Sequence, residues 1–480
     1  MLISIEQRPG KLIISYVKKD GTIGFTQLVI PASHQYIYAY AQKNKGIPGL
    51  LSWDFKPVRK IATQFINRHR IQEFFMDAGE DVTGHLFEAN MPILSACDIE
   101  VDVTDEGFAE PSTANNRINS ISFSQYPDIV TFGNKILSGE ECVEIERGLN
   151  EHISKSNKKY NFIYKYHKNE ADMLYDFLYN YARQAILITG WNFWGYDWRY
   201  MMNRCKKLNL NVDWLSPTGQ WFPQKIKDHN ESVEIMLPQH KLIIDYMAIY
   251  QKWDRTIEVK ENDTLDFVSE ESLGIKKLQY SGNLQDMYNK DFVKYILYNC
   301  IDTVLIELLD LKLKTMATFL GLGNITRVEA MTAFSPIAML EATLTRYAYK
   351  RGQIFPKKEE SKEREQYEGA FVFEPIRGIY PWVAIWDFAS LYPSIMRQFK
   401  ISVENFLFKD KNYEPKDNQI KTYSGAVFDA SYDPLLSTIL TDYYTQRKDA
   451  KKVSLLAEKE ADELKKILKQ RKKEVNKQIN

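Results

Sequence analysis

The sequence has few cysteines, and no two of them are close together in the chain. Cys97, Cys142, Cys205 and Cys300 are scattered over 480 residues without a Cys-x-x-Cys pair. This spacing argues against a disulfide framework and a cysteine zinc site, and it predicts reduced intracellular thiols. The sequence also lacks an apolar run long enough to span a bilayer, and its N-terminus turns polar too early for a signal peptide. We therefore expect a cytoplasmic protein without a membrane partner.

An excess of charge of either sign is absent as well. Lys and Arg number 63, and Asp and Glu also number 63. The net charge therefore does not indicate a nucleic-acid binder, although a protein with acidic metal sites and local basic tracks is compatible with this balance. An apolar fraction of 44% and a charged fraction of 26% are ordinary for a globular chain, and the length predicts several domains.

The most distinctive stretch present is Trp386–Ile395, which reads WDFASLYPSI. We expect a strand from Trp382 to Trp386 that presents Asp387 at its end, with Pro393 stopping the strand. A carboxylate held there can bind Mg²⁺ while neighbouring backbone N–H groups receive phosphate oxygens. This combination suits phosphoryl or nucleotidyl transfer, but a strand that simply ends in a turn has the same pattern.

Two further candidate sites carry carboxylates. Asp98 and Glu100 alternate in a predicted strand and share one face, where their repulsion favours a bound cation. Asp197 follows a predicted helix, 169–184, and a predicted strand, 185–189, so an α/β layer could place it at the same edge. The first pair is also common by chance, and the aromatics around Asp197 are equally compatible with core packing.

The last acidic position lies in a predicted long helix, 291–319. Tyr298 and Asp302 are four residues apart and therefore lie on one face of that helix. A tyrosine hydroxyl beside a metal-bound carboxylate can orient an attacking water. An ordinary local hydrogen bond between the two side chains is the alternative.

Taken together, these motifs resemble a known family. In order and spacing they resemble the three exonuclease motifs of DnaQ-like (RNase H-like) proofreading domains: Asp98-x-Glu100, Asn192-x3-Tyr196-Asp197 and Tyr298-x3-Asp302. Tyr196 stands where Phe is usual. The stretch around Asp387 resembles the first polymerase motif of family B DNA polymerases, and residues 367–406 look most like those of T-even-like bacteriophages.

The resemblance implies two Mg²⁺ or Mn²⁺ ions at the exonuclease site. Asp98 would bridge both ions, while Glu100 and Asp302 would hold the ion that carries the attacking water. Asp197 would reach the second ion. Tyr298 would orient the water.

The resemblance also implies a nucleotide site. Asp387 would bind metal together with the backbone of Phe388. The amides of three residues would meet the triphosphate, namely Ser390, Leu391 and Tyr392. The ring of Tyr392 would exclude a 2′-hydroxyl by steric clash. Residues 367–370 resemble a turn that such enzymes place near the template.

A basic helix is predicted at the C-terminal end, from about 436 to 480. From Gln446 onward it carries 12 Lys and Arg against 6 Asp and Glu. Such a run is often a solvated helix face or a short coiled coil. By resemblance it is the start of the fingers, where Arg447, and Lys451 one turn later, would contact the triphosphate.

The predicted fold class is a multidomain α/β and α+β chain. An N-terminal β-rich domain would cover residues 1–92 and 315–358, and the DnaQ-like exonuclease domain residues 93–314. A partial palm would follow at 359–433 and a partial fingers helix at 434–480. Residues 1–30 read as a β-meander, 58–78 and 326–349 as helical, and 221–244 as a hairpin.

Two motifs of the family do not occur: Lys-x3-Asn-Ser-x-Tyr-Gly and Asp-Thr-Asp. We therefore expect the N-terminal part of a phage polymerase that acts in the host cytoplasm. The polymerase is either truncated or naturally split into two polypeptides, and we favour the split form. Its partners would be primer-template and single-stranded DNA, dNTP, a second polypeptide with the remaining motifs, and a sliding clamp. The alternative is a non-catalytic DNA-binding or assembly subunit of a replication complex.

Overall fold

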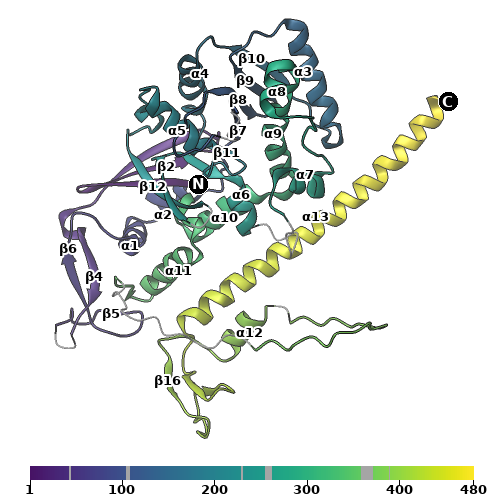
Figure 1. Cartoon of the computed structure of the whole chain (residues 1–480). Coiled ribbons are helices and arrows are strands. Elements are labelled where there is room, and N and C mark those ends of the chain that lie inside the picture. The colour runs from purple at the N-terminus through teal and green to yellow at the C-terminus, as the bar shows by residue number, and fades with distance from the viewer. Residues whose placement is uncertain are drawn as a thin grey trace. The chain divides into compact units, whose positions relative to one another are not determined.

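The computed structural model describes residues 1–42, 45–103, 109–228, 231–253, 262–357, 371–388 and 390–479, with side chains to residue 471 (Figure 1). The chain forms two compact units. The first consists of residues 1–35 and 75–342, and the second of residues 36–74 and 343–480. Among the described residues, no helix is both long and apolar enough to cross a membrane. The four predicted domain ranges divide the chain more finely than these units and stay predictions.

The first unit begins with a three-stranded antiparallel sheet. Its strands are β1 (Leu2–Arg8), β2 (Lys11–Val17) and β3 (Ile23–Val29). Apolar side chains alternate along these strands, and the inward ones, such as Leu12 and Ile14, are fully buried. The predicted β-rich N-terminus is confirmed.

A six-stranded mixed sheet forms the centre of the first unit, in the order β10-β9-β8-β7-β11-β14. Its strands are β7 (Leu94–Val101), β8 (Ile118–Gln125), β9 (Asp128–Gly133), β10 (Asn161–Tyr166), β11 (Leu187–Gly190) and β14 (Leu242–Asp245). β7, β8 and β9 pair antiparallel, whereas β11 and β14 continue the sheet in parallel. β7 is thus a central strand, bonded on both sides.

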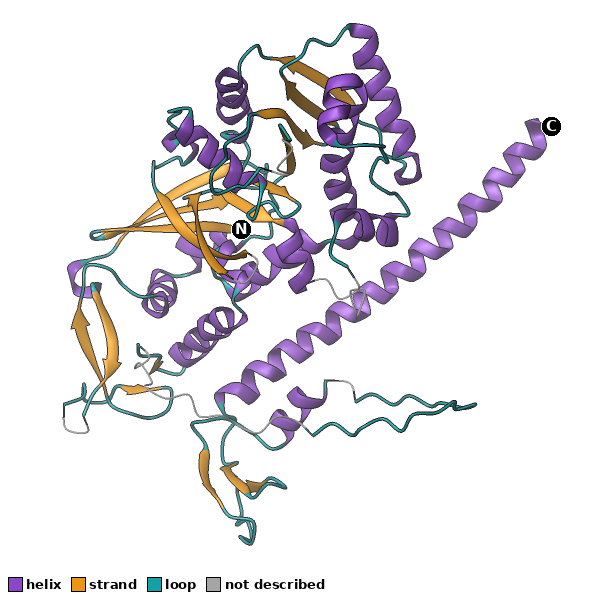
Figure 2. Ribbon diagram, in the orientation of Figure 1, coloured by secondary structure: helices purple, strands orange, loops and turns teal. Residues whose placement is uncertain are grey.

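Helices cover both faces of this sheet (Figure 2). One core contains buried side chains of α3 (Gly139–His152) and α9 (Phe292–Leu313), and the other contains those of α4 (Glu170–Phe177) and α5 (Asp197–Lys207). Alternate residues of β7 divide between the two cores, with Ala96 in the first and Cys97 in the second. The predicted mixed α/β architecture is confirmed.

Shorter elements complete the first unit. Its other helices are α2 (Glu80–Thr83), α6 (Tyr246–Trp253), α7 (Leu265–Leu273), α8 (Leu284–Lys290) and α10 (Thr315–Thr326). The predicted hairpin is formed by β12 (Trp221–Asp228) and β13 (Glu231–Pro238), whereas Leu242–Asp245 joins the central sheet. β14 is parallel to β11, so its backbone groups pair there rather than with the hairpin.

Two predicted helical stretches are wrong in extent. The predicted helix 291–319 is broken at Lys314, whose φ of 57° is left-handed. Asp310 caps the next helix, because its Oδ1 accepts the backbone N–H of Met316 at 2.8 Å. The helix expected at 326–349 is a 3₁₀ helix at Ala330–Phe334 followed by α11 (Pro336–Lys350).

The second unit contains several small sheets and a long helix. β4 (Tyr36–Tyr40) pairs with β6 (Val58–Ala62), β5 (Leu51–Ser52) pairs with β15 (Gln353–Ile354), and β16 (Phe406–Lys409), β18 (Ala426–Asp429) and β17 (Gln419–Lys421) form a third sheet. The stretch expected to be helical at 58–78 therefore starts as a strand, and α1 (Arg68–Ala78) follows it. The predicted C-terminal helix is confirmed as α13 (Leu435–Ile479).

The strand expected at Trp382–Trp386 is wrong. Residues 382–388 have no regular secondary structure, and α12 (Leu391–Gln398) follows them. Trp382 is 92% exposed and Trp386 91% exposed, and among the described residues no strand pairs with this segment. A strand needs a neighbour for its backbone groups. Pro393 does not stop a strand but lies in the first turn of α12, where proline is tolerated.

Candidate exonuclease site

The site is built on the middle of the central sheet. Asp98 and Glu100 lie on β7, opposite Ser122 and Ser120 of β8. Their side chains point to the same face because they are two residues apart in a strand. The pairing of β7 with β8 extends over both acids and fixes their positions, whereas the pairing of β7 with β11 ends at Ala96.

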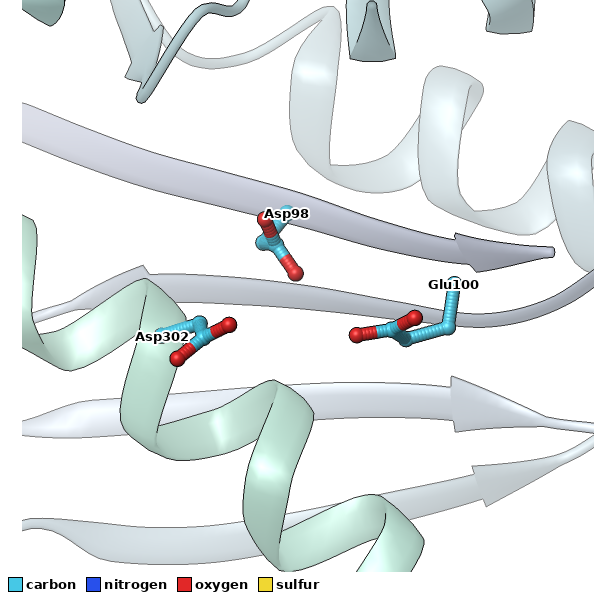
Figure 3. Close-up of side chains that lie close together, drawn as sticks. All are labelled: Asp98, Glu100 and Asp302. Carbon is cyan, nitrogen blue, oxygen red and sulfur yellow. The ribbon is translucent and has the colours of Figure 1, made fainter. Parts of the chain in front are cut away.

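Helix α9 brings a third carboxylate to this face. α9 packs against β7 and β8, and its residue Asp302 faces the two acids of β7 (Figure 3). One carboxylate oxygen from each of Asp98, Glu100 and Asp302 lies within 4.8 Å of the others. The predicted position Tyr298 lies one turn earlier on the same helix and is buried. The structure therefore brings together acids separated by about 200 residues in the sequence.

The protein environment makes it costly to hold three negative charges here. Glu100 is 8% exposed and Asp302 is 3% exposed. The pKa of Asp98 is raised to about 7, mainly by burial and secondly by the charge of Asp302. Burial, and next the charge of Asp98, raise the pKa of Glu100 well above its usual range. A cation among these groups would offset their repulsion.

Asn299 holds Asp98 in place from α9. Its Nδ2 donates to Asp98 Oδ2 at 2.6 Å. Its Oδ1 accepts from the hydroxyl of Ser120 at 2.8 Å and from that of Ser122 at 2.6 Å. Asn299 is fully buried, and its amide orientation is fixed because the serines donate and the carboxylate accepts.

Lys277 places a positive charge beside the cluster. Its Nζ lies 2.5 Å from Asp302 Oδ2 and 4.9 Å from the centre of the Tyr298 ring. Burial lowers the pKa of Lys277, but the charges of Asp302 and Tyr298 and the hydrogen bonds to them together outweigh it, so the net shift is upward. Burial, and next the charge of Asp302, raise the pKa of the Tyr298 hydroxyl. Lys277 therefore stays charged and Tyr298 stays protonated at neutral pH.

Asp197 is close to the site but is not one of the three clustered acids. It is the first residue of α5, and its Oδ1 accepts the backbone N–H of Ile99 at 3.1 Å, between the two acids of β7. Burial, and next the charge of Asp98, raise its pKa. The structure thus places Asp197 beside β7, at the edge of the cluster.

The clustered residues fit a divalent metal ion. They are carboxylates, which hard cations such as Mg²⁺ and Mn²⁺ prefer. Oδ1 of Asp302 is buried and has no hydrogen-bond partner in the described part of the chain. A buried carboxylate oxygen normally has a partner. Asp302 belongs to the cluster of three acids, so this oxygen would be available to a metal ion.

The predicted nucleotide-site residues lie in the second unit. Asp387 and Phe388 are exposed and precede α12, whose first residues are Leu391 and Tyr392. Ser390 has a left-handed φ of 57° at the start of this helix. Two further predicted residues, Arg447 and Lys451, are exposed on α13. The predicted template-side turn at residues 367–370 lies outside the described residues.

α12 and α13 contact each other in the second unit. Arg397 of α12 donates from Nε to the Thr441 hydroxyl at 3.1 Å, and its guanidinium lies 4.6 Å from the centre of the Tyr444 ring. These contacts join the helix that follows Asp387 to the helix that carries Arg447. The roles predicted for these residues stay predictions.

Two residues of the site were missed by reasoning from the sequence. Asn299 had a usable signal, because it lies three residues before Asp302 and thus on the same helix face. Lys277 had none, because it lies in the connection 274–283 between α7 and α8, where no periodicity indicates a direction. Only the packing of that connection against α9 brings Lys277 to Asp302.

Two models of known protein families match parts of the chain. The model of the exonuclease domain of DNA polymerase family B matches residues 58–266, and the model of DNA polymerase family B matches residues 337–477. Together the two matches cover more than half of the chain. The chain therefore belongs to DNA polymerase family B and contains the family's exonuclease domain.

The chain is also similar to individual DNA polymerases. The chain is 29% identical over 397 residues to the DNA-directed DNA polymerase of Escherichia phage RB69, covering 77% of this chain and 43% of that protein. It is 26% identical over 402 residues to the DNA-directed DNA polymerase of Enterobacteria phage T4, with coverage of 78% and 43%. The DNA polymerase delta catalytic subunit of Candida albicans is 29% identical over 304 residues, 59% of this chain and 29% of that protein. The chain thus spans less than half the length of these relatives.

Proposed function

We propose that the chain is the N-terminal part of a phage family B DNA polymerase and that it hydrolyses DNA from the 3′ end in a Mg²⁺-dependent reaction. The observation that supports this activity is the convergence of Asp98, Glu100 and Asp302 within 4.8 Å. The substrate would be single-stranded DNA or the frayed end of a primer-template, in the cytoplasm of the infected host cell.

The residues of the site have distinct tasks in this proposal. Asp98, Glu100 and Asp302 would hold the metal, with Asp197 reaching it from α5. Bound divalent ions would supply an activated water and stabilise the leaving oxygen.

Two further residues would act on the substrate side. The Tyr298 hydroxyl keeps its proton, so it orients the attacking water by hydrogen bonding rather than by removing a proton. Lys277 keeps its charge beside Asp302 and offsets part of the negative charge that a phosphodiester adds to the site.

The test is hydrolysis of a 5′-labelled single-stranded oligonucleotide by the full chain with Mg²⁺. Substituting Asp98 and Glu100 together by Ala should abolish release of 3′ nucleotides. The control is Asp286→Ala, which removes an acid of α8 that lies outside the cluster. Persistent hydrolysis in the Asp98 and Glu100 variant would refute the site assignment.

Metal titration separates this proposal from a non-catalytic assembly subunit. The unaltered chain should bind Mn²⁺ more tightly than Asp98→Ala does, because Asp98 supplies one of the three clustered oxygens. Equal affinities would indicate carboxylates without a catalytic task, and they would favour the assembly subunit.

We also propose that a second polypeptide completes a polymerase site with Asp387. The exposed apolar surface of the second unit supports this proposal, since surfaces of this kind usually contact a partner. Phe371 is 82% exposed, Trp382 is 92% exposed, and on α13 Leu456 and Leu464 are 62% and 65% exposed. The partner would carry the two family motifs that this sequence lacks.

Nucleotide addition tests the completed site. In this proposal Asp387 and the backbone of Phe388 bind metal, and the triphosphate contacts are Ser390, Leu391, Tyr392, Arg447 and Lys451. Primer extension should need the second polypeptide, and Asp387→Ala should abolish it while leaving 3′ hydrolysis unchanged. Extension by this chain alone would contradict the proposal.

A further inference from the structure

The connection 274–283 holds Lys277 against the acidic cluster, although it has no regular secondary structure. A lysine side chain is long and flexible, and loops are generally more mobile than the elements they join. The 2.5 Å contact with Asp302 therefore requires that the backbone at Lys277 be fixed by other residues.

Two side chains bind the peptide unit between Lys276 and Lys277, one at each end of the unit. The Nε2–H of His152 donates to the carbonyl oxygen of Lys276 at 2.7 Å. Asp266 Oδ1 accepts the backbone N–H of Lys277 at 2.7 Å. This carbonyl and this N–H belong to the same planar peptide unit and point in opposite directions. Fixing both ends sets the plane of the peptide and thereby the direction in which Lys277 leaves the backbone.

The two holding residues belong to rigid elements. His152 is the last residue of α3, which packs against α9, and Asp266 lies in the first turn of α7, which also packs against α9. Lys155, just beyond α3, adds a third contact by donating to the Gly274 carbonyl at 2.5 Å. α9 carries Asp302 and also packs against α3 and α7, which hold the backbone at Lys277. The same helix therefore fixes the positions of both partners of the Lys277–Asp302 pair.

We propose that His152 and Asp266 are positioning residues of the exonuclease site, which act by holding the Lys276–Lys277 peptide so that Lys277 faces Asp302. This inference rests on the proposed exonuclease function. Among the described residues, neither is hydrogen-bonded to an acid of the cluster, so their hydrogen bonds act through Lys277, whereas the charge of Asp266 also reaches Asp302 directly.

Single substitutions test the hydrogen bonds themselves. His152→Ala should lower kcat for hydrolysis of a single-stranded oligonucleotide roughly two- to tenfold, the range for one lost neutral hydrogen bond, with KM unchanged. His152→Gln retains an N–H donor and should restore most of kcat. Asp266→Asn keeps the acceptor oxygen, so its kcat should be higher than that of Asp266→Ala. The matched control is Lys158→Ala, whose ammonium lies over the Tyr126 ring.

A double-mutant cycle separates positioning from a general loss of structure. His152→Ala should have little further effect in a Lys277→Met background, measured in single turnovers with excess enzyme. If Lys277→Met hydrolyses too slowly to measure, Mn²⁺ titration replaces the assay: His152→Ala should change the affinity only when Lys277 is present.

Three results would overturn the inference: equal losses in both backgrounds, no benefit of His152→Gln over His152→Ala, or an unchanged kcat in His152→Ala. Hydrolysis by the unaltered chain is measured first. Its absence would refute the proposed function, whereas the Mn²⁺ cycle would still report on the positioning of Lys277.

Discussion

Replacing Lys277 by Met should destabilise the metal-free protein and should matter much less when metal is bound. Lys277 Nζ lies 2.5 Å from Asp302 Oδ2, and these side chains are 26% and 5% exposed. Removing one partner of a buried ion pair typically costs about 3–5 kcal/mol, and the Coulomb energy of such a contact in protein is of similar size. In the absence of Lys277, Asp302 can take up a proton, which limits the loss. We therefore expect Lys277→Met to lower the free energy of unfolding by about 3 kcal/mol at pH 8.

Thermal unfolding of the full chain in EDTA and in Mn²⁺ measures this effect. In EDTA, Lys277→Met should lower Tm by several degrees. In Mn²⁺ the loss should shrink, because the ion supplies the positive charge that the acids lack. The control is Lys290→Met, which breaks an exposed pair with Asp286 and should change stability by at most about 0.5 kcal/mol. An equal loss in EDTA and in Mn²⁺ would refute a role of Lys277 as counter-charge to the cluster.

Two further predictions concern pH. Because the pKa of Asp98 is raised to about 7, protons compete with metal below that pH. Mn²⁺ affinity should therefore rise with pH up to about 7, and Asp98→Asn should make this rise less steep; a titration at pH 5, 6 and 7 measures it. Burial raises the pKa of Glu307 from 4.5 to about 7, so its contribution to stability is fully present below pH 4.5 and is lost as pH rises through 7, by about 3 kcal/mol in all. Glu307→Gln should reduce the fall in the free energy of unfolding between pH 5 and pH 8, and an unchanged slope would contradict this assignment.

Local patterns in the sequence were sufficient to predict three acids that the structure brings together, Asp98, Glu100 and Asp302. Asp98 and Glu100 share a face because a strand has a period of two, and Tyr298 and Asp302 share one because a helix has a period of 3.6. The β-rich N-terminus and the mixed α/β architecture were also predictable, since alternation and amphipathic spacing determine them.

Features that depend on distant segments could not be predicted in this way. Asn299 contacts Asp98 across 201 residues, and Lys277 reaches Asp302 only because an irregular connection folds onto α9. The predicted strand 382–386 failed for a related reason. Its side chains favour a strand, but among the described residues it has no neighbour to pair with. The break at Lys314 depends on how Asp310 caps α10.

The polar contacts between α9 and the sheet have a mechanical consequence. Asn299 is bonded to hydroxyls of β8, and eight residues later Glu307 accepts from Ser124 Oγ and Tyr160 Oη, both at 2.8 Å. A slide of α9 by one turn, about 5.4 Å, would unpair both groups in the interior, at about 1–3 kcal/mol for each group left unsatisfied. Movement of α9 along the sheet is therefore costly, so these contacts keep Asp302 in register with Asp98 and Glu100.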